Sequence, residues 1–257
     1  MLFNDNYFQR KLAEALEQVN KPGYVPVGDS DDEARIAAEV TAGRADWRRE
    51  MALEQAETNG VPARYRSFKL ADFEIHAAGQ EEALERLVDF VETAARSYEA
   101  KRDFLAMPRD GLFLHGACGT GKTTLAAYIG NFFSRHAVPA RFELFGDILE
   151  RYRSTMNASA ETTAAAITRR LVDVPVLIID DLGQTQLTAY SAETLFKLVN
   201  GRINRGGLTI ITSNLDLPGL EKRLSAAQPQ TAAAIISRFH SFEVVRLPGD
   251  DYRKRKK

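Results

Sequence analysis

A glycine-rich segment with one lysine offers the clearest chemistry in this sequence. Residues 116–123 read Gly-Ala-Cys-Gly-Thr-Gly-Lys-Thr, which matches the pattern G-x-x-x-x-G-K-[ST] in full. Glycines let the backbone curl until successive N–H groups point at phosphate oxygens, and a helix that begins there adds positive potential. In this pattern Lys122 reaches the β- and γ-phosphates of a nucleotide, and the hydroxyl of Thr123 is a ligand of Mg²⁺. The alternative is a glycine-rich turn that contains a lysine by chance. The residues predicted to bind the nucleotide are Gly116, Cys118, Gly119, Thr120, Gly121, Lys122, Thr123 and Thr124.

Two carboxylates follow an apolar strand later in the chain. Residues 176–181 read Val-Leu-Ile-Ile-Asp-Asp, and an all-apolar run of this kind is typical of a strand buried in a parallel sheet. The carboxyl ends of such strands present ligands to bound nucleotides. We therefore predict that Asp180 holds Mg²⁺ through water and that Asp181 polarises the water that attacks the γ-phosphate. On its own, the segment is equally compatible with a strand that ends in a capped, solvated turn.

Two further polar residues are candidates for the same site. Asn214 follows the apolar strand predicted at 208–213, and in a parallel sheet it would lie beside the attacking water and the γ-phosphate. An isolated asparagine is more often a turn residue. Arg238 follows Ile235-Ile236-Ser237 on a helix just before the last strand, and the sequence alone favours a surface arginine that covers apolar neighbours.

Strands and helices alternate from about residue 68 onward, and this alternation is typical of a parallel α/β sheet. The predicted strands are 111–115, 141–145, 176–180, 208–213 and 242–247. The predicted helices are 80–101, 122–135, 147–156, 160–171 and 191–205. In this arrangement the phosphate loop follows the first strand and opens a helix, which is the context that its pattern requires.

The first 60 residues have a different character. Their 7 basic and 12 acidic residues give a net charge of −5, which leaves +4 on the remainder. Phe8, Leu12 and Leu16 form an apolar stripe at helical spacing, and a linker rich in proline and glycine follows at about 20–32. We predict that residues 1–60 are a helical arm that binds a protein partner through this stripe, and that residues 61–257 are the catalytic domain. The alternative is a stripe that packs on the chain's own domain.

Composition narrows the class of protein further. The chain has 257 residues, a formal net charge of −1 and a single cysteine. Balanced charge argues against a uniformly basic protein that coats nucleic acid, and one cysteine excludes an intramolecular disulfide. The amino terminus has charged residues where a signal peptide needs an apolar run, and no apolar stretch approaches the ~20 residues of a membrane-spanning helix. We expect a soluble cytoplasmic protein without membrane partners.

Together these segments resemble AAA+ ATPases, in particular the DnaC-type bacterial helicase loaders and their IstB-type relatives. The resemblance extends from residue 61 to the carboxyl terminus. It depends on GLFLHGACGTGKTTLAAYIGN at 111–131, LIIDDLG at 177–183, TIITSNL at 209–215 and GDDYRKR from Gly249, together with GVPARY at 60–65 and the segment Ser67-Phe68…Phe73. It implies a three-layer α/β/α fold with a five-stranded parallel sheet.

The same resemblance assigns roles to the candidate residues. Asp180 and Asp181 would take the Walker B roles, Asn214 that of sensor 1, and Arg238 that of an arginine finger that completes the site of a neighbouring subunit. Three features depart from the family pattern. Cys118 stands where proline is common, Ala234 replaces a second arginine, and only 19 residues follow Arg238, so we expect no helical lid domain at the carboxyl terminus.

The loader branch also implies a path for single-stranded DNA. In that branch a helix inserted after the second strand and the loop after Walker B line the path. The corresponding segments here are 147–156, with Arg151 and Arg153, and 184–190, with Thr188 and Tyr190. Basic groups beside an aromatic side chain suit single-stranded DNA. An ordinary amphipathic helix followed by a solvated loop is the alternative.

The resemblance therefore implies a Mg²⁺-dependent ATPase, stimulated by DNA or a partner, that self-associates through its ATP site. Such a protein delivers or opens a hexameric replicative helicase on single-stranded DNA. The alternative within the fold is an IstB-type transposition ATPase that acts with a transposase on double-stranded DNA. A non-catalytic adaptor is disfavoured because Lys122, Thr123, Asp180 and Asp181 are all present, and a GTPase because no N-K-x-D motif occurs.

Overall fold

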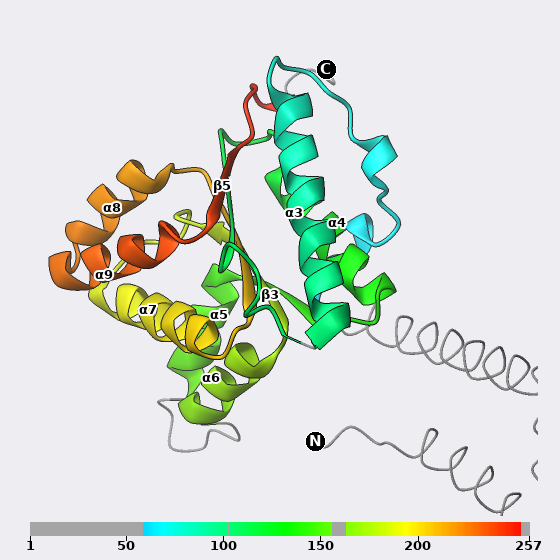
Figure 1. The fold of residues 1–257 in the computed structure, drawn as a ribbon. Helices are drawn as coiled ribbons and strands as arrows, with labels where there is room; N and C mark the ends of the chain where they lie inside the picture. Colours follow the sequence, from blue (N-terminus) through cyan, green and yellow to red (C-terminus); the bar gives the residue numbers. More distant parts are fainter. Residues whose placement is uncertain (1–58, 102, 156–162, 253–257) are drawn as a thin grey trace, which may run out of the picture. The chain divides into compact units, whose positions relative to one another are not determined.

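The computed structural model of the chain describes residues 59–101, 103–155 and 163–252, which contain a five-stranded sheet with helices on both faces (Figure 1). Its strands are β1 (Gly111–His115), β2 (Ala140–Leu144), β3 (Val176–Leu182), β4 (Leu208–Ser213) and β5 (Glu243–Arg246). They lie in the order β2-β3-β4-β1-β5, and every neighbouring pair is parallel. The predicted α/β fold with a five-stranded parallel sheet is confirmed.

Alternate side chains of the inner strands enter two separate cores, which produces three layers. Leu112 and Leu114 of β1 lie in one core, and Phe113 between them lies in the other. The first core is completed by α3 (Gln80–Lys101) and α4 (Lys122–Arg135). The second is completed by α5 (Phe145–Ser154), α6 (Ala164–Asp173), α7 (Ala189–Asn204), α8 (Leu217–Ser225) and α9 (Pro229–Phe239). Two short 3₁₀ helices, η1 (Ala63–Tyr65) and η2 (Leu70–Asp72), precede α3.

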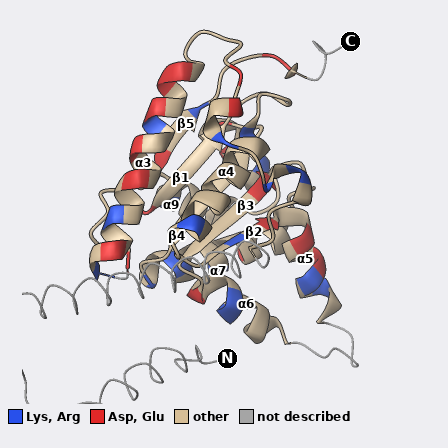
Figure 2. Cartoon of the chain, turned by 90° about the vertical axis from the view of Figure 1, so that its right-hand side faces the viewer, with Lys and Arg blue, Asp and Glu red and all other residues tan. Residues whose placement is uncertain are grey.

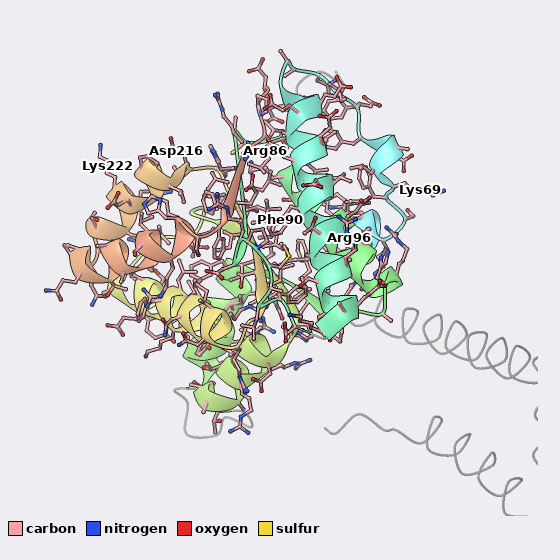
Figure 3. The ribbon with its side chains drawn as sticks, in the orientation of Figure 1. Lys69, Arg86, Phe90, Arg96, Asp216 and Lys222 are labelled. Atoms are coloured by element: carbon pink, nitrogen blue, oxygen red, sulfur yellow. The ribbon has the colours of Figure 1, made fainter. Side chains whose placement is uncertain are left out.

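Helix α3 shows how an amphipathic sequence attaches to this sheet. Phe90 is buried in the first core, whereas Arg96 is exposed and pairs with Glu92 one turn earlier at 3.5 Å (Figure 3). Arg86 donates to the carbonyl of Val244 on β5 at 3.0 Å. The apolar stripe therefore supplies the packing, and a long basic side chain ties the helix to the edge strand.

The predicted elements match the structure closely but not everywhere. The bounds of β1, β4, α3 and α4 agree with the prediction, and the other predicted elements shift by up to four residues. Helix α8 was not among the predicted elements, because Leu217-Pro218-Gly219 resembles a turn. Proline is tolerated in the first turn of a helix, and Asp216 caps α8 by accepting a bond from Gly219 N at 2.9 Å.

The described domain begins no later than Asn59, two residues before the predicted boundary at residue 61. The side chain of Asn59 donates to Ser134 Oγ on α4 at 3.0 Å, and its carbonyl accepts from Phe142 N on β2 at 2.6 Å. The predicted partner-binding residues Phe8, Leu12 and Leu16 and the linker at about 20–32 lie outside the described residues. The division between arm and domain thus stays a prediction.

No additional helical domain follows β5 within the described residues. The segment Leu247 to Tyr252 instead continues alongside the phosphate loop, where Leu247 N donates to His115 O at 2.7 Å and Tyr252 N donates to Gly119 O at 3.1 Å. None of the helices in the described parts of the chain has the length and apolar character needed to span a membrane.

Candidate nucleotide-binding site

The phosphate loop connects β1 to α4, and two of its glycines are required by the backbone and by close neighbours. Gly121 caps α4 with φ +101°, and Gly119 has φ +76°, conformations that residues with a side chain rarely adopt. A Cβ on Gly121 would lie 2.7 Å from a ring carbon of Phe73, and one on Gly119 would overlap Asp251. Helix α4 begins at Lys122, as the motif predicts.

Lys122 lies within the loop rather than in solvent. Its side chain is only 6% exposed, and Nζ donates to the carbonyls of Gly116 at 3.0 Å and Ala117 at 2.7 Å. These bonds hold the loop in its curled form and keep a positive charge at its centre. An ammonium in this position suits the phosphates of a nucleotide.

A buried carboxylate faces the start of α4. Asp180 is 1% exposed and accepts bonds from Thr123 Oγ1 at 3.0 Å and from Thr212 Oγ1 on β4 at 2.5 Å. Burial raises the pKa of Asp180, although the bonds from the two threonines oppose this shift. The structure thus brings together the two predicted Mg²⁺ ligands, Thr123 and Asp180.

This donor set fits a magnesium ion that shares its ligands with a nucleotide. Mg²⁺ prefers oxygen ligands and usually takes one or two from the protein, with the rest from phosphates and water. A hydroxyl and a carboxylate within hydrogen-bonding distance match that pattern. Among the described residues, no group of three or more His, Cys, Asp and Glu side chains could enclose a metal without other ligands.

Strand β3 is irregular at Asp181, the residue after Asp180. The register between β3 and β4 shifts between Ile179 and Leu182, so β3 continues past the predicted end at residue 180. Asp181 has φ +62°, a left-handed conformation that aspartate tolerates better than most residues, and its N–H donates to Thr212 Oγ1 at 3.0 Å. Bulges often redirect a side chain next to a functional site. Asp180 is buried, whereas Asp181 lines the adjoining cavity.

The cavity at this edge of the sheet has a volume of about 430 Å³, within the range of small-molecule sites. Eight predicted site residues line it together with Asp181: Cys118, Gly119, Thr120, Gly121, Lys122, Thr123, Thr124 and Asn214. Asn214 follows β4, as the sequence predicts. Gly116 and Asp180 lie behind this lining: Gly116 accepts the bond from Lys122, and Asp180 is buried against Thr123.

One wall of the cavity has no counterpart among the predicted site residues. Its aromatic part comes from Tyr65, Phe68, Phe73, His76 and Tyr252. The rings of His76 and Tyr252 stack with centroids 4.6 Å apart, and Tyr252 Oη donates to Glu74 Oε2 at 2.7 Å. Segments from both ends of the domain therefore meet beside the phosphate loop. Ring faces next to a phosphate site suit a nucleotide base.

Arg238 lies on α9, outside the lining of its own chain's cavity. Its Nε and Nη2 both donate to Asn200 Oδ1, at 3.0 and 2.6 Å, and its guanidinium carbon lies 4.5 Å from the ring centroid of Phe196. The structure therefore does not bring Arg238 together with Lys122 and Asp181. An arginine that completes a neighbour's site must lie outside its own, and that role stays a prediction.

The four predicted DNA-binding residues do not form one exposed surface. Arg151 pairs with Glu143, Thr188 caps α7 by accepting from Ser191 N at 3.3 Å, and Tyr190 packs against the second core. Arg153 alone among the four is exposed, on the last turn of α5. Figure 2 shows basic residues on both α5 and α6, with acidic residues on α5 as well. Any path for DNA there would have to compete with these internal contacts.

A parallel sheet in the order β2-β3-β4-β1-β5, with a phosphate loop after β1 and two carboxylates at the end of β3, defines a P-loop nucleotide-binding protein of the AAA+ class. The sequence model described as IstB-like ATP binding protein matches residues 64–257, which is most of the chain. The chain therefore belongs to this family of IstB-like ATP-binding proteins. The predicted kinship with IstB and DnaC proteins is confirmed.

Individual relatives agree with this assignment. The chain is 24% identical over 166 residues to the "Replicative helicase loader DnaC" of Buchnera aphidicola subsp. Schizaphis graminum, an alignment that covers 65% of this chain and 63% of that protein. The crystal structure of DnaI has a TM-score of 0.61 at 24% identity and covers 77% of this chain and 98% of that chain. The crystal structure of the DnaC helicase loader has a TM-score of 0.56 at 22% identity, and the alignment covers 72% of this chain and 99% of that chain. At such identities the solved structures support the fold alone. The chain spans 43% to 63% of the length of the curated relatives it matches.

Proposed function

We propose that this chain is a Mg²⁺-dependent ATPase of the cytoplasm that loads a hexameric replicative helicase onto single-stranded DNA. The observation that carries the ATPase part is one constellation at the carboxyl edge of the sheet. Lys122 and Thr123 of the phosphate loop and Asp181 line one cavity of nucleotide size, and Asp180 is buried directly behind Thr123.

Each residue of this constellation has a distinct role in the proposal. Lys122 neutralises charge on the β- and γ-phosphates, and Asp181 accepts a hydrogen bond from the attacking water and orients it. Thr123 and Asp180 would hold Mg²⁺, which supplies further neutralisation of phosphate charge when bound. Asn214, at the end of β4, contacts the γ-phosphate or the water from the side opposite the loop.

A neighbouring subunit completes this site through its Arg238. In this chain Arg238 is held on α7 and α9 and does not line the chain's own cavity, which supports action on another subunit. The chain therefore self-associates through the ATP site, and hydrolysis is stimulated when DNA or a partner promotes that association. Two inactive variants test this part. Arg238→Ala retains its pocket and Lys122→Ala retains its finger, so their mixture recovers activity only if the site is shared.

The proposed partner is a hexameric helicase, bound through Phe8, Leu12 and Leu16 of the arm. Support comes from the helicase loader DnaC of Buchnera as a relative and from the stripe's helical spacing. Single-stranded DNA is the proposed nucleic acid, for which Arg153 and the basic residues of α5 and α6 offer phosphate contacts. A second candidate is transposition with a transposase, because the family model that matches the chain is described as IstB-like.

Affinity capture with the full-length chain separates the two candidates. Purified replicative helicase and purified transposase from the same host are offered in turn, with ATP present. We expect retention of the helicase and a strong decrease in that retention when Phe8, Leu12 and Leu16 are all replaced by alanine. A matched control replaces the polar residues Gln9, Lys11 and Glu17 of the same segment. Retention of the transposase alone would favour the second candidate.

A further inference from the structure

The side chain of Arg238 is held by two residues of a neighbouring helix. Helices α7 and α9 lie side by side (Figure 1), and Phe196 and Asn200 stand one turn apart on α7. Asn200 Oδ1 accepts from both Nε and Nη2 of Arg238, at 3.0 and 2.6 Å. The guanidinium lies over the ring of Phe196 at 4.5 Å, and Nη1 donates to the carbonyl of Ala234 at 2.9 Å.

These contacts hold an otherwise flexible side chain without using all of its hydrogen-bond donors. A guanidinium carries five N–H donors, and three of them are used in the contacts with Asn200 and Ala234. The ring of Phe196 covers one face of the guanidinium. Asn200 is neutral, so unlike an aspartate or glutamate it does not cancel the positive charge. What remains is a held, half-buried cation with donors available for an anion.

We propose that Phe196 and Asn200 are positioning residues that hold Arg238 in the orientation in which it enters the ATP site of the neighbouring subunit. This inference rests on the proposed function, in which Arg238 serves a shared site. An arginine has several rotatable bonds, and the freedom lost when it meets a phosphate opposes catalysis unless the side chain is ordered beforehand. The contacts on α7 provide that order within the subunit before it meets its neighbour.

Phe196 and Asn200, which we call the Arg238 clamp, are also connected through helix α7 to the chain's own nucleotide site. The helix begins at Ala189, soon after the end of β3, and the connecting loop contributes Gln184 to the cavity lining. The carbonyl of Gly183 in the same loop accepts a bond from Arg223 of α8. A displacement of this loop on nucleotide binding would therefore reach Arg238 through one rigid helix.

The test compares Asn200→Leu, which keeps the side-chain size and removes the acceptor, with Asn200→Gln, which keeps a neutral amide acceptor. We expect Asn200→Leu to bind ATP normally and to hydrolyse it at least about tenfold more slowly, because one lost hydrogen bond to a charged group has about this effect and Asn200 accepts two. Asn200→Gln retains more of the activity than Asn200→Leu. Lys197→Ala, an exposed position on the same helix, is the matched control and should equal the parent.

Mixing shows whether the defect is in the finger or in the chain's own pocket. The amount of Asn200→Leu protein is held constant, and Lys122→Ala protein, which has an inactive pocket and an intact Arg238 clamp, is added. The added protein should increase the rate of ATP hydrolysis by the Asn200→Leu protein. Phe196→Leu should behave in the same way, and Asn200→Leu should add nothing to the loss in Arg238→Ala. Thermal unfolding checks that each variant is folded, and if Asn200→Leu is not, Phe196→Leu takes its place in the comparison.

Unchanged or faster hydrolysis by Asn200→Leu would overturn the proposal, because the contacts would then be dispensable or would hold Arg238 away from its target. A loss that added Lys122→Ala protein cannot relieve would overturn it as well. If Arg238→Ala itself hydrolyses ATP at the parental rate, the shared site of the proposed function fails. If Arg238→Ala is impaired and Asn200→Leu is not, only the clamp fails.

Discussion

Two charged side chains with almost no exposure lie at opposite ends of the parallel sheet, and their polar atoms are satisfied in different ways. At the amino end, Arg202 of α7 is 0% exposed. Its guanidinium donates to Thr209 Oγ1 at 2.8 Å and to five backbone carbonyls, those of Leu171, Val172, Val174, Pro175 and Leu208. At the carboxyl end, Asp180 is 1% exposed and accepts bonds from two threonine hydroxyls.

The difference separates a structural charge from a functional one. Arg202 uses all of its nitrogen atoms to join the end of α6, the start of β3 and the start of β4, so its partners are complete within the protein. Burial shifts the pKa of both groups toward the uncharged form: it raises the pKa of Asp180 and lowers that of Arg202 to about 9. Asp180, however, lies against Thr123 of the phosphate loop, and its neighbour Asp181 has a left-handed backbone and lines the nucleotide cavity. Backbone strain of this kind concentrates at functional sites.

The largest expected effect is on stability and concerns Arg202, at the amino end of the sheet. Arg202→Leu should lower the free energy of unfolding by about 3 to 5 kcal/mol, because several buried carbonyls lose their donor at once. Arg202→Lys keeps the charge with fewer donors and should lose less. Urea unfolding of the three proteins measures the difference. A loss under about 1 kcal/mol in Arg202→Leu would remove the structural role assigned to this residue.

The next effect is on catalysis and lies at the carboxyl end. Asp181→Asn should bind ATP with nearly parental affinity and hydrolyse it at least about 100-fold more slowly, because the substitution keeps the shape and removes the charge that orients water. Nucleotide binding measured beside turnover distinguishes this role from that of Asp180. Equal loss of binding and hydrolysis would mean that the two carboxylates have exchanged roles.

Asp180→Asn is expected to have a smaller effect on the free energy of unfolding than Arg202→Leu, and one of opposite sign. Because the folded pKa of Asp180 is raised above its ordinary value of 3.8, the ionised side chain lowers stability at neutral pH, and the penalty fades as pH falls through the raised pKa to below 3.8. Asp180→Asn should therefore be more stable than the parent at pH 7 and lose hydrolysis. The stability difference should disappear at acid pH. A variant less stable than the parent at neutral pH contradicts this account of the carboxyl end.

The smallest effect concerns the free cysteine, Cys118, which is exposed and lines the nucleotide cavity. Bound ATP should slow the labelling of Cys118 by a thiol reagent, and prior labelling should block ATP binding. Lys122→Ala protein is the control, since ATP should give it little protection. Identical labelling rates with and without ATP in the parent protein would place the ligand elsewhere.

The sequence predicts the carboxyl end of the sheet far better than the amino end. The phosphate loop, the end of β3 and Asn214 are contiguous motifs whose chemistry depends on local spacing, and all lie at one cavity. Thr212, which bonds both Asp180 and the N–H of Asp181, is one of several polar residues at the end of β4, and spacing alone does not distinguish it. The register shift beside Asp181 depends on pairing with β4 and has no signature in the sequence of β3 itself.

Residues brought together only by tertiary packing were not predictable. Arg202 falls within a predicted amphipathic helix and looks like any basic surface residue there. The aromatic wall of the cavity joins Phe73 and His76 to Tyr252, which are separated by most of the domain sequence. The prediction that Arg151 binds DNA follows from the resemblance to the loader branch, and only the fold reveals its pairing with Glu143.

The central claim is that the carboxyl end of the sheet binds and hydrolyses ATP. Steady-state ATP turnover by the parent and by Lys122→Ala, with Mg²⁺ and single-stranded DNA present, tests it most directly. Thermal unfolding of both proteins checks that the amino end, held by Arg202, is intact. The account predicts Mg²⁺-dependent turnover by the parent and none detectable above background in a folded Lys122→Ala. Equal turnover by the two proteins would contradict it.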